Sequence, residues 1–258
     1  MADYRQVREG MERVSAALLK GLASLLHPRM LWLTVWPMLV ALAIWLTLAV
    51  LYWSQAIAWV DLELHQWAAY RWTLSVWPLS LLASWLGWLL LVFLFVPVVL
   101  MTAVLIVSIV SMPVMVAHVG ERDYPQLERR KGGTFAGSLW NGLLAVALLA
   151  LLFALTLPLW LIPIFWPVLP IALLGYFNQR VYRYDALAEH GTPGEIAEMI
   201  SRSRGELFPL GMALALVGHL PLVGLAMPVY GGLVFIHYSL SRLAELRSEP
   251  IEGSARRV

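Results

Sequence analysis

The residues at the start of one long uncharged segment could bind a small anion. Pro28, Arg29 and Met30 follow an amphipathic stretch, and the uncharged segment runs on from Leu31. A helix that begins at such a proline has free N–H groups at its start, and a guanidinium beside them suits an oxyanion. Alternatively, Arg29 is a positively charged flank whose long side chain reaches to the membrane surface. The sequence leaves both interpretations open.

Two arginines and one histidine near a later uncharged segment could also meet an anion. Arg202 and Arg204 precede this segment beside Glu206, and His219 lies within it in the motif GHLP. The arginines could bind or gate an anion, or they could flank the membrane and pair with nearby acidic side chains. His219 could sense pH or bind an anion, or it could hydrogen-bond to a neighbouring group. Together with the first group, these residues are the predicted substrate-binding residues.

The sequence contains none of the catalytic or metal-binding motifs that we searched for. It contains no phosphate-binding Walker loop, no nucleophile elbow, no HExxH motif and no paired metal-ligand spacing. It contains no cysteine, which excludes thiolate ligands, disulfides and cysteine nucleophiles. We therefore expect neither an enzyme nor a metal site nor a cofactor.

Prolines lie in the middle of two long uncharged segments, 138–178 and 207–241. Basic residues flank each segment on both sides, so each is expected to leave and return to the same face as a helical hairpin. Interrupted helices are tolerated at membrane depth only against protein or in a water-lined cavity. The tips near Pro158–Pro170 and His219–Pro228 therefore either line a substrate path or form proline turns at the outer interface.

Long stretches with few or no charged residues indicate an integral membrane protein. They are Met30–Tyr70, in which only Asp61 and Glu63 are charged, Trp72–Gly120, Thr134–Gln179 and Leu207–Ser241. The chain is 60% hydrophobic and 13% charged, whereas ordinary domains are about 45–50% apolar and about 25% charged. We expect one all-α, multi-pass membrane domain over residues 1–258, with lipid as a partner. Nucleic acid is not expected, because no basic cluster is interleaved with exposed aromatic residues.

Charge and hydrophobic periodicity predict six elements in this domain. Residues 4–26 form an amphipathic helix that lies on the membrane surface or packs on its own protein. Residues 31–53 form a spanning helix, followed by an interfacial helix over 54–71. Residues 79–112 form a second, long spanning helix, tilted or kinked at Pro97, and the two hairpins follow. Their arms could cross fully or penetrate the membrane only in part.

The positive charges indicate the orientation. Of the eighteen Lys and Arg residues, only Arg71 falls outside the N-terminal region, the connections 118–133 and 179–206, and the region after 241. Cytoplasmic segments carry an excess of Lys and Arg. The sequence therefore predicts two complete crossings and cytoplasmic termini.

The chain resembles the CysZ sulfate permeases and the etoposide-induced-protein family that shares their domain. The resemblance covers roughly residues 10–245. It depends on the prolines and polar residues Pro28, Pro37, Tyr182–Asp185, Arg202, Arg204, Gly211, Pro221 and Pro228. It implies a bacterial-type inner-membrane protein that is a homo-oligomer. It also implies two long transmembrane helices, two hemi-penetrating hairpins and inward transport of sulfate.

The chain departs from this family at the position where the anion is expected. The family pattern Pro-Gly-Ile-Arg-Arg is replaced by Pro28-Arg29-Met30-Leu31-Trp32, so the arginine pair is lost. The pattern Pro-Phe-Asn reads Pro113-Val114-Met115, and an asparagine near the second tip reads Gly224. The leading hypothesis is a permease or channel-like protein for a small inorganic anion such as sulfate. The alternative is a non-transporting membrane protein that scaffolds partners or remodels lipid.

Overall fold

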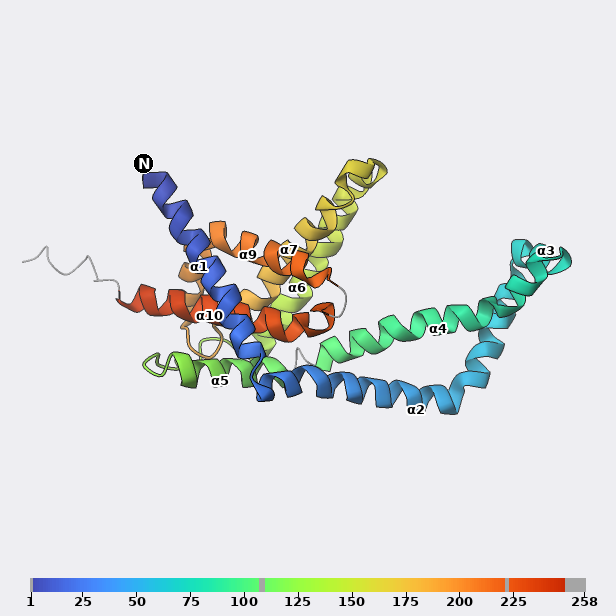
Figure 1. The fold of residues 1–258 in the computed structure, drawn as a ribbon, viewed down its shortest axis with the longest axis horizontal. Coiled ribbons are helices and arrows are strands. Elements are labelled where there is room, and N and C mark those ends of the chain that lie inside the picture. The colour runs from blue at the N-terminus through green and yellow to red at the C-terminus, as the bar shows by residue number, and fades with distance from the viewer. Residues whose placement is uncertain (1, 107–109, 221–222, 249–258) are drawn as a thin grey trace, which may run out of the picture. The chain divides into compact units, whose positions relative to one another are not determined.

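The computed structural model describes residues 2–106, 110–220 and 223–248 (Figure 1), and within these ranges the structure contains helices and no strand. The all-helical class predicted from the sequence is confirmed. Contacts group the chain into two compact units, Met1–Thr34 with Val110–Val258, and Val35–Ile109. That residues 1–258 form a single domain stays a prediction.

The second unit is an antiparallel helical hairpin. It contains α2 (Pro28–Gln66) beyond Thr34, the short α3 (Ala68–Ser75) at the turn and α4 (Leu79–Ile106). Paired contacts set the register: Trp45 Nε1 donates to Thr102 Oγ1 at 2.9 Å, and the rings of Trp53 and Trp88 lie 5.4 Å apart. Near the turn, the Tyr70 hydroxyl donates to the carbonyl of Ala83 at 3.1 Å. From pair to pair, the residue numbers rise from α2 to α3 and fall along α4, so α2 and α4 run in opposite directions.

The first spanning helix is longer than predicted. α2 has 39 residues and is therefore roughly 58 Å long, whereas a bilayer core is about 30 Å thick. The predicted break into helices 31–53 and 54–71 is wrong, because no proline or glycine interrupts the chain between Ser54 and Gln66. The predicted helix 79–112 covers α4 and the first residue of α5 (Met112–Asp123), and residues 107–109 lie outside the described residues.

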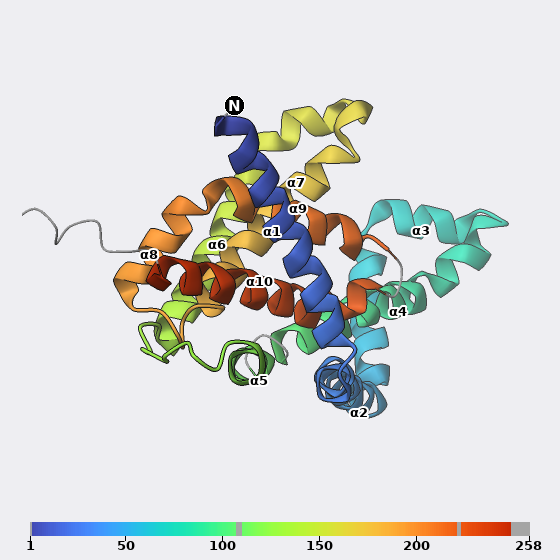
Figure 2. The ribbon, with the colours of Figure 1, turned by 60° about the vertical axis from the view of Figure 1, so that its left-hand side comes forward.

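The first unit is built around α10 (Val223–Ser248), in which every residue from 229 to 240 is buried. An uncharged helix can be buried on all sides. Helix α10 contacts α1 (Ala2–Leu25), α5, α7 (Val168–Asp185) and α9 (Arg204–Gly218). Figure 2 shows α1 crossing over α10. The short α8 (Pro193–Arg202) also packs on it.

Both predicted hairpins occur in this unit. The first consists of α6 (Phe135–Thr156), the short 3-10 helices η2 (Leu157–Leu161) and η3 (Pro163–Phe165) at the tip, and α7. The second is formed by α9 and α10. Pro228 was expected at its tip but lies inside α10, where it removes a single helical hydrogen bond, and Pro221 lies outside the described residues.

The two hairpins pack on each other through glycines. A Cβ on Gly211 of α9 would lie 2.2 Å from the carbonyl oxygen of Gly175 on α7, and a Cβ on Gly175 would lie 2.7 Å from Met212 Cγ. Small residues allow the backbones of membrane helices to approach this closely. The helices α6, α7, α9 and α10 therefore form one packed group.

The N-terminal helix α1 packs on its own protein and also exposes apolar side chains. A Cβ on Gly21 would lie 2.4 Å from Val234 Cγ2, and the Tyr230 hydroxyl donates to the carbonyl of Leu18 at 3.2 Å. Small residues thus face α10, whereas Met11 and Leu19 are 69% and 68% exposed. That α1 also lies in the membrane surface stays a prediction.

Three helices in the described residues are long and apolar enough to cross a membrane: Pro28–Gln66, Leu79–Val96 and Phe135–Leu161. Many of the large apolar side chains on these helices are exposed. Phe93 and Leu155, for example, are 80% and 66% exposed. An apolar surface of this extent is typical of contact with lipid.

Candidate functional site

The turn from α1 to α2 holds the predicted anion-binding residues. Pro28 occupies the first position of α2, where its missing N–H costs nothing. The N–H groups of Met30 and Leu31 donate to the carbonyl of His27 at 2.8 and 3.0 Å, and the N–H of Arg29 donates to His27 Nδ1 at 3.3 Å. Met30 is fully buried and anchors the helix start, whereas Pro28 and Arg29 are exposed.

Basic side chains from a distant part of the sequence gather at this helix start. The rings of His27 and His118 lie 4.9 Å apart. Burial, and then the positive charges of His27, Arg122 and Arg29, lower the pKa of His118 below its ordinary value of 6.5. His118 Nε2 is buried and has no hydrogen-bond partner in the described part of the chain. We call His27, Arg29, His118 and Arg122 the α2-start cluster.

The second predicted group lies where α8 meets α9. Arg202 ends α8 and forms an ion pair with Glu198 at 2.7 Å, while Arg204 begins α9 and is exposed. Glu206 accepts two hydrogen bonds from Arg13 of α1, at 2.8 and 3.1 Å, and one from the Tyr238 hydroxyl at 2.9 Å. Its carboxylate therefore fastens α1 and α10 to α9.

His219 ends α9, and its side chain contacts its own helix. Its Nδ1 lies 2.6 Å from the carbonyl oxygen of Ala215, a hydrogen bond that spans one helical turn. The ring is thus held by a local backbone group. The predicted site residues therefore occupy three separate places: the start of α2, the α8–α9 junction and the end of α9.

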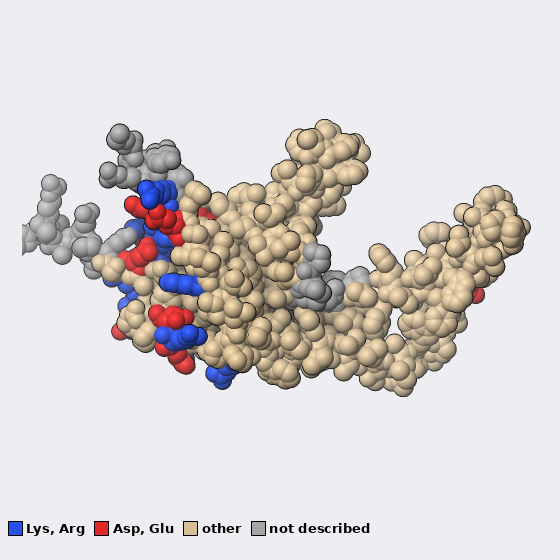
Figure 3. All heavy atoms as spheres, viewed as in Figure 1, with Lys and Arg blue, Asp and Glu red and all other residues tan. Residues whose placement is uncertain are grey.

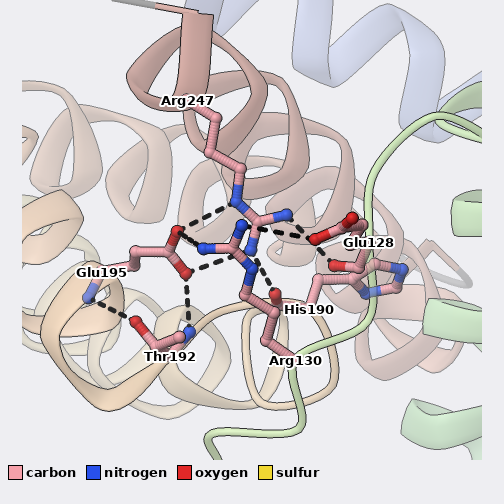
Figure 4. A network of polar contacts seen from close by, with 6 residues as sticks. All are labelled: Glu128, Arg130, His190, Thr192, Glu195 and Arg247. Carbon is pink, nitrogen blue, oxygen red and sulfur yellow. Dashed lines mark hydrogen bonds and ion pairs between the residues drawn. The ribbon is translucent and has the colours of Figure 1, made fainter. Parts of the chain in front are cut away.

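An ion-pair network that was not predicted joins two loops to the end of α10 (Figure 4). Arg130 and Arg247 both donate to Glu195 Oε1 at 2.9 Å, and the N–H of Thr192 donates to Glu195 Oε2 at 2.8 Å. Arg247 also donates to the carbonyl of His190 at 2.7 Å. The hydrogen bond from Arg247, together with those from Thr192, lowers the pKa of Glu195 to about 2.

Part of this network has a sequence signal that was missed. Thr192 and Glu195 enclose Pro193 in the pattern of a capping box, and both of its hydrogen bonds are present at the start of α8. Thr192 Oγ1 accepts from the N–H of Glu195 at 3.2 Å. The arginines of this network are paired with its carboxylates and backbone carbonyls, so we assign it a structural role.

Charged side chains gather at one end of the first unit, as Figure 3 shows. The tip of the first hairpin, formed by η2 and η3, contains no charged residue. Within the residues that the structure describes, no group of three His, Cys, Asp or Glu side chains is placed to hold a metal ion. The polar surface that can meet charged solutes is thus concentrated at the ends of α1, α5, α8 and α10.

Exposed apolar helices, two hairpins and a charged end define a polytopic helical membrane protein. The chain belongs to the sulfate transporter CysZ/etoposide-induced protein 2.4 family, whose model matches residues 17–228. The resemblance predicted from the sequence is confirmed. No curated protein and no solved structure matches the chain. The family is of the transporter type and is not an enzyme family.

Proposed function

We propose that this protein is a permease for a small inorganic anion, with sulfate as its substrate, in a bacterial inner membrane. Membership of a family named for a sulfate transporter supports the substrate class. The observation that carries the proposal is the α2-start cluster. There, the exposed Arg29 at the start of a 39-residue helix lies beside two histidines and Arg122. A helix start with an adjacent guanidinium favours an oxyanion.

The substrate would first meet the Arg29 side chain at Pro28–Met30, because the N–H groups of Arg29 and Met30 already donate to His27. Leu31 and Trp32 replace the arginine pair of the family pattern, so the positive charge at this helix start comes from Arg29 and Arg122, and from His118 when it is protonated. Arg202, Arg204 and His219 would act later on the path, which the second hairpin would line. We also propose that the working form is a homo-oligomer embedded in lipid.

Uptake of labelled sulfate into liposomes tests the site. We expect flux through the wild-type protein above that of empty vesicles, and a fall to the empty-vesicle level in Arg29→Ala. Arg8→Ala is the matched control, because Arg8 is a highly exposed arginine on α1 outside the cluster. Wild-type flux in Arg29→Ala would overturn the site, and an equal loss in both variants would show a general charge effect.

The pH dependence of uptake tests the role of the histidines. Because the pKa of His118 lies below 6.5, the ring is neutral at pH 7 and gains a positive charge as the pH falls. We expect sulfate uptake to rise as the external and internal pH are lowered together from 7.5 to values below 6.5, because the pKa of His118 lies below that value. His118→Gln should flatten this rise, and an unchanged pH profile in the variant would rule out the contribution of His118.

A second candidate function is favoured by the surface of α1. Met11 and Leu19 on this helix are exposed, as is Leu26 at 66%, and such a strip suits insertion into a lipid leaflet. A protein that remodels lipid or scaffolds partners would bind anionic vesicles through α1 and conduct no anion. Vesicle binding without flux of any tested anion would favour this function over transport.

A further inference from the structure

A cavity of about 50 Å³, lined by basic and small apolar side chains, lies between α1 and α10, and it shares no residue with the α2-start cluster. This volume has room for roughly three to five water molecules. The cavity is lined by α1 residues Arg13, Ala16, Ala17 and Lys20, and by α10 residues His237, Tyr238, Ser241 and Arg242. All of them belong to the first unit.

The sequence of α1 explains why a space remains between the two helices. The α1 lining residues recur at spacings of three and four, so they lie on one face of the helix. Arg13 lies one helical turn before Ala16 and Ala17, and Lys20 lies one turn after them. Because the alanine side chains are small, they do not fill the space between Arg13 and Lys20. Tight packing of Gly21 on Val234 and the Arg13–Glu206 ion pair hold the helices at this separation.

The charges around the cavity leave a positive excess. Arg13 is paired with Glu206, and Arg242 is paired with Glu245. Lys20 forms no ion pair or hydrogen bond with any described residue. Its ammonium group is therefore available to a ligand, and an anion would be attracted to it. The nearest acid to His237 is Asp123, whose carboxylate lies 3.9 Å from the ring.

Two residues that line the cavity carry buried polar atoms without a hydrogen-bond partner in the described residues. The side chain of His237 is 2% exposed, and its Nε2 bonds to Ser24 Oγ at 2.8 Å. Its Nδ1, and the Nε of Arg242, are buried without a hydrogen-bond partner in the described residues. Leaving such atoms unpaired is unfavourable.

We propose that this cavity binds a tetrahedral oxyanion of the phosphate type, either as free inorganic phosphate or as the phosphomonoester headgroup of a lipid. The cavity is large enough for one such group and too small for a larger organic ligand. Lys20, Arg13 and Arg242 carry only N–H donors in their side chains, which suit the oxygen atoms of the anion. The basic lining disfavours a cation.

Binding of inorganic phosphate to the purified full-length protein tests the proposal. Phosphate would be titrated calorimetrically at constant ionic strength in neutral detergent. We expect saturable binding that weakens about tenfold in Lys20→Gln, because a charge-assisted hydrogen bond is lost. Ala16→Leu fills the cavity from an exposed position without changing any charge, and it should abolish binding. Arg8→Gln removes one positive charge from the same helix outside the cavity and should bind as the wild type does.

Lipid vesicles distinguish the two sources of the phosphate group. If the ligand is a headgroup, phosphatidic acid should compete with phosphate and co-purify with the wild type but not with Lys20→Gln. If the ligand is the free anion, phosphatidic acid should have no effect. Absence of saturable binding of either, or wild-type binding in both Lys20→Gln and Ala16→Leu, would overturn the proposal. Binding should persist in Arg29→Ala, so this site can stand even if sulfate transport fails.

Discussion

At the scale of single residues, Glu195 shows how one carboxylate can organise a polar surface. Its side chain is only 14% exposed and meets Arg247, whose side chain is 16% exposed, at 2.9 Å. Arg130 and the backbone of Thr192 complete its partners. An acidic side chain so enclosed is stable only while its partners remain, because an unpaired buried charge is strongly disfavoured.

Glu195→Gln should therefore destabilise the first unit by roughly 2 kcal/mol at neutral pH. The pKa of Glu195 is lowered from 4.5 to about 2, so its contribution is complete above pH 4.5 and is lost as the pH falls toward 2. Thermal unfolding in detergent should show a gap between wild type and variant at pH 7 that closes between these values. A gap independent of pH would contradict the electrostatic explanation.

Residue-level prediction succeeded where partners are close in sequence. The local hydrogen bond of His219 spans four residues, and it was one of the two interpretations open from the motif GHLP. The neighbours of Arg29 could not be predicted, because His118 and Arg122 lie on α5, far from Arg29 in the sequence. The partners of Glu195 were hidden for the same reason. Tertiary structure, and not local pattern, selects such pairs.

At the scale of elements, the glycine contact between α7 and α9 should be highly sensitive to size. Gly211→Ala would place a methyl group 2.2 Å from a backbone oxygen of Gly175, so the helices must move apart. We expect a loss of about 2 kcal/mol or more, measured by thermal unfolding. Gly142→Ala is the matched control in α6, because a Cβ there meets nothing within 4 Å. The control should be neutral or stabilising by up to about 1 kcal/mol.

Charge and proline patterns predicted the kinds of elements better than their ends. Both hairpins were expected because basic residues flank uncharged segments that contain central prolines. The length of α2 was underestimated, because Asp61 and Glu63 suggested an interface although nothing broke the helix. The orientation of α1 was also missed. Hydrophobic periodicity selects its large side chains, but Gly21 and Ala17 are the residues that pack on α10, because they allow a close approach.

At the scale of the whole molecule, charge placement and hydrophobic length together establish a membrane protein but not its substrate. Uncharged segments of this length cannot be buried within a chain of 258 residues, and the structure leaves their side chains exposed. The candidate anion site was predicted in part: the start of α2 was expected from Pro28 and Arg29, whereas the histidine partner and the cavity beside Lys20 required the packed helices.

The orientation of the chain in the membrane can be tested directly because the protein contains no cysteine. Gln126 and Gly194 are exposed residues in the two basic connections, and Glu63 is exposed near the end of α2. Since Lys and Arg favour the cytoplasmic side, a membrane-impermeant maleimide should label Glu63→Cys in intact cells. Gln126→Cys and Gly194→Cys should be labelled only after the membrane is opened, and labelling of all three in opened membranes is the control. Labelling of either connection in intact cells would overturn the predicted topology, and with it the cytoplasmic position of the charged surface near the two proposed anion sites.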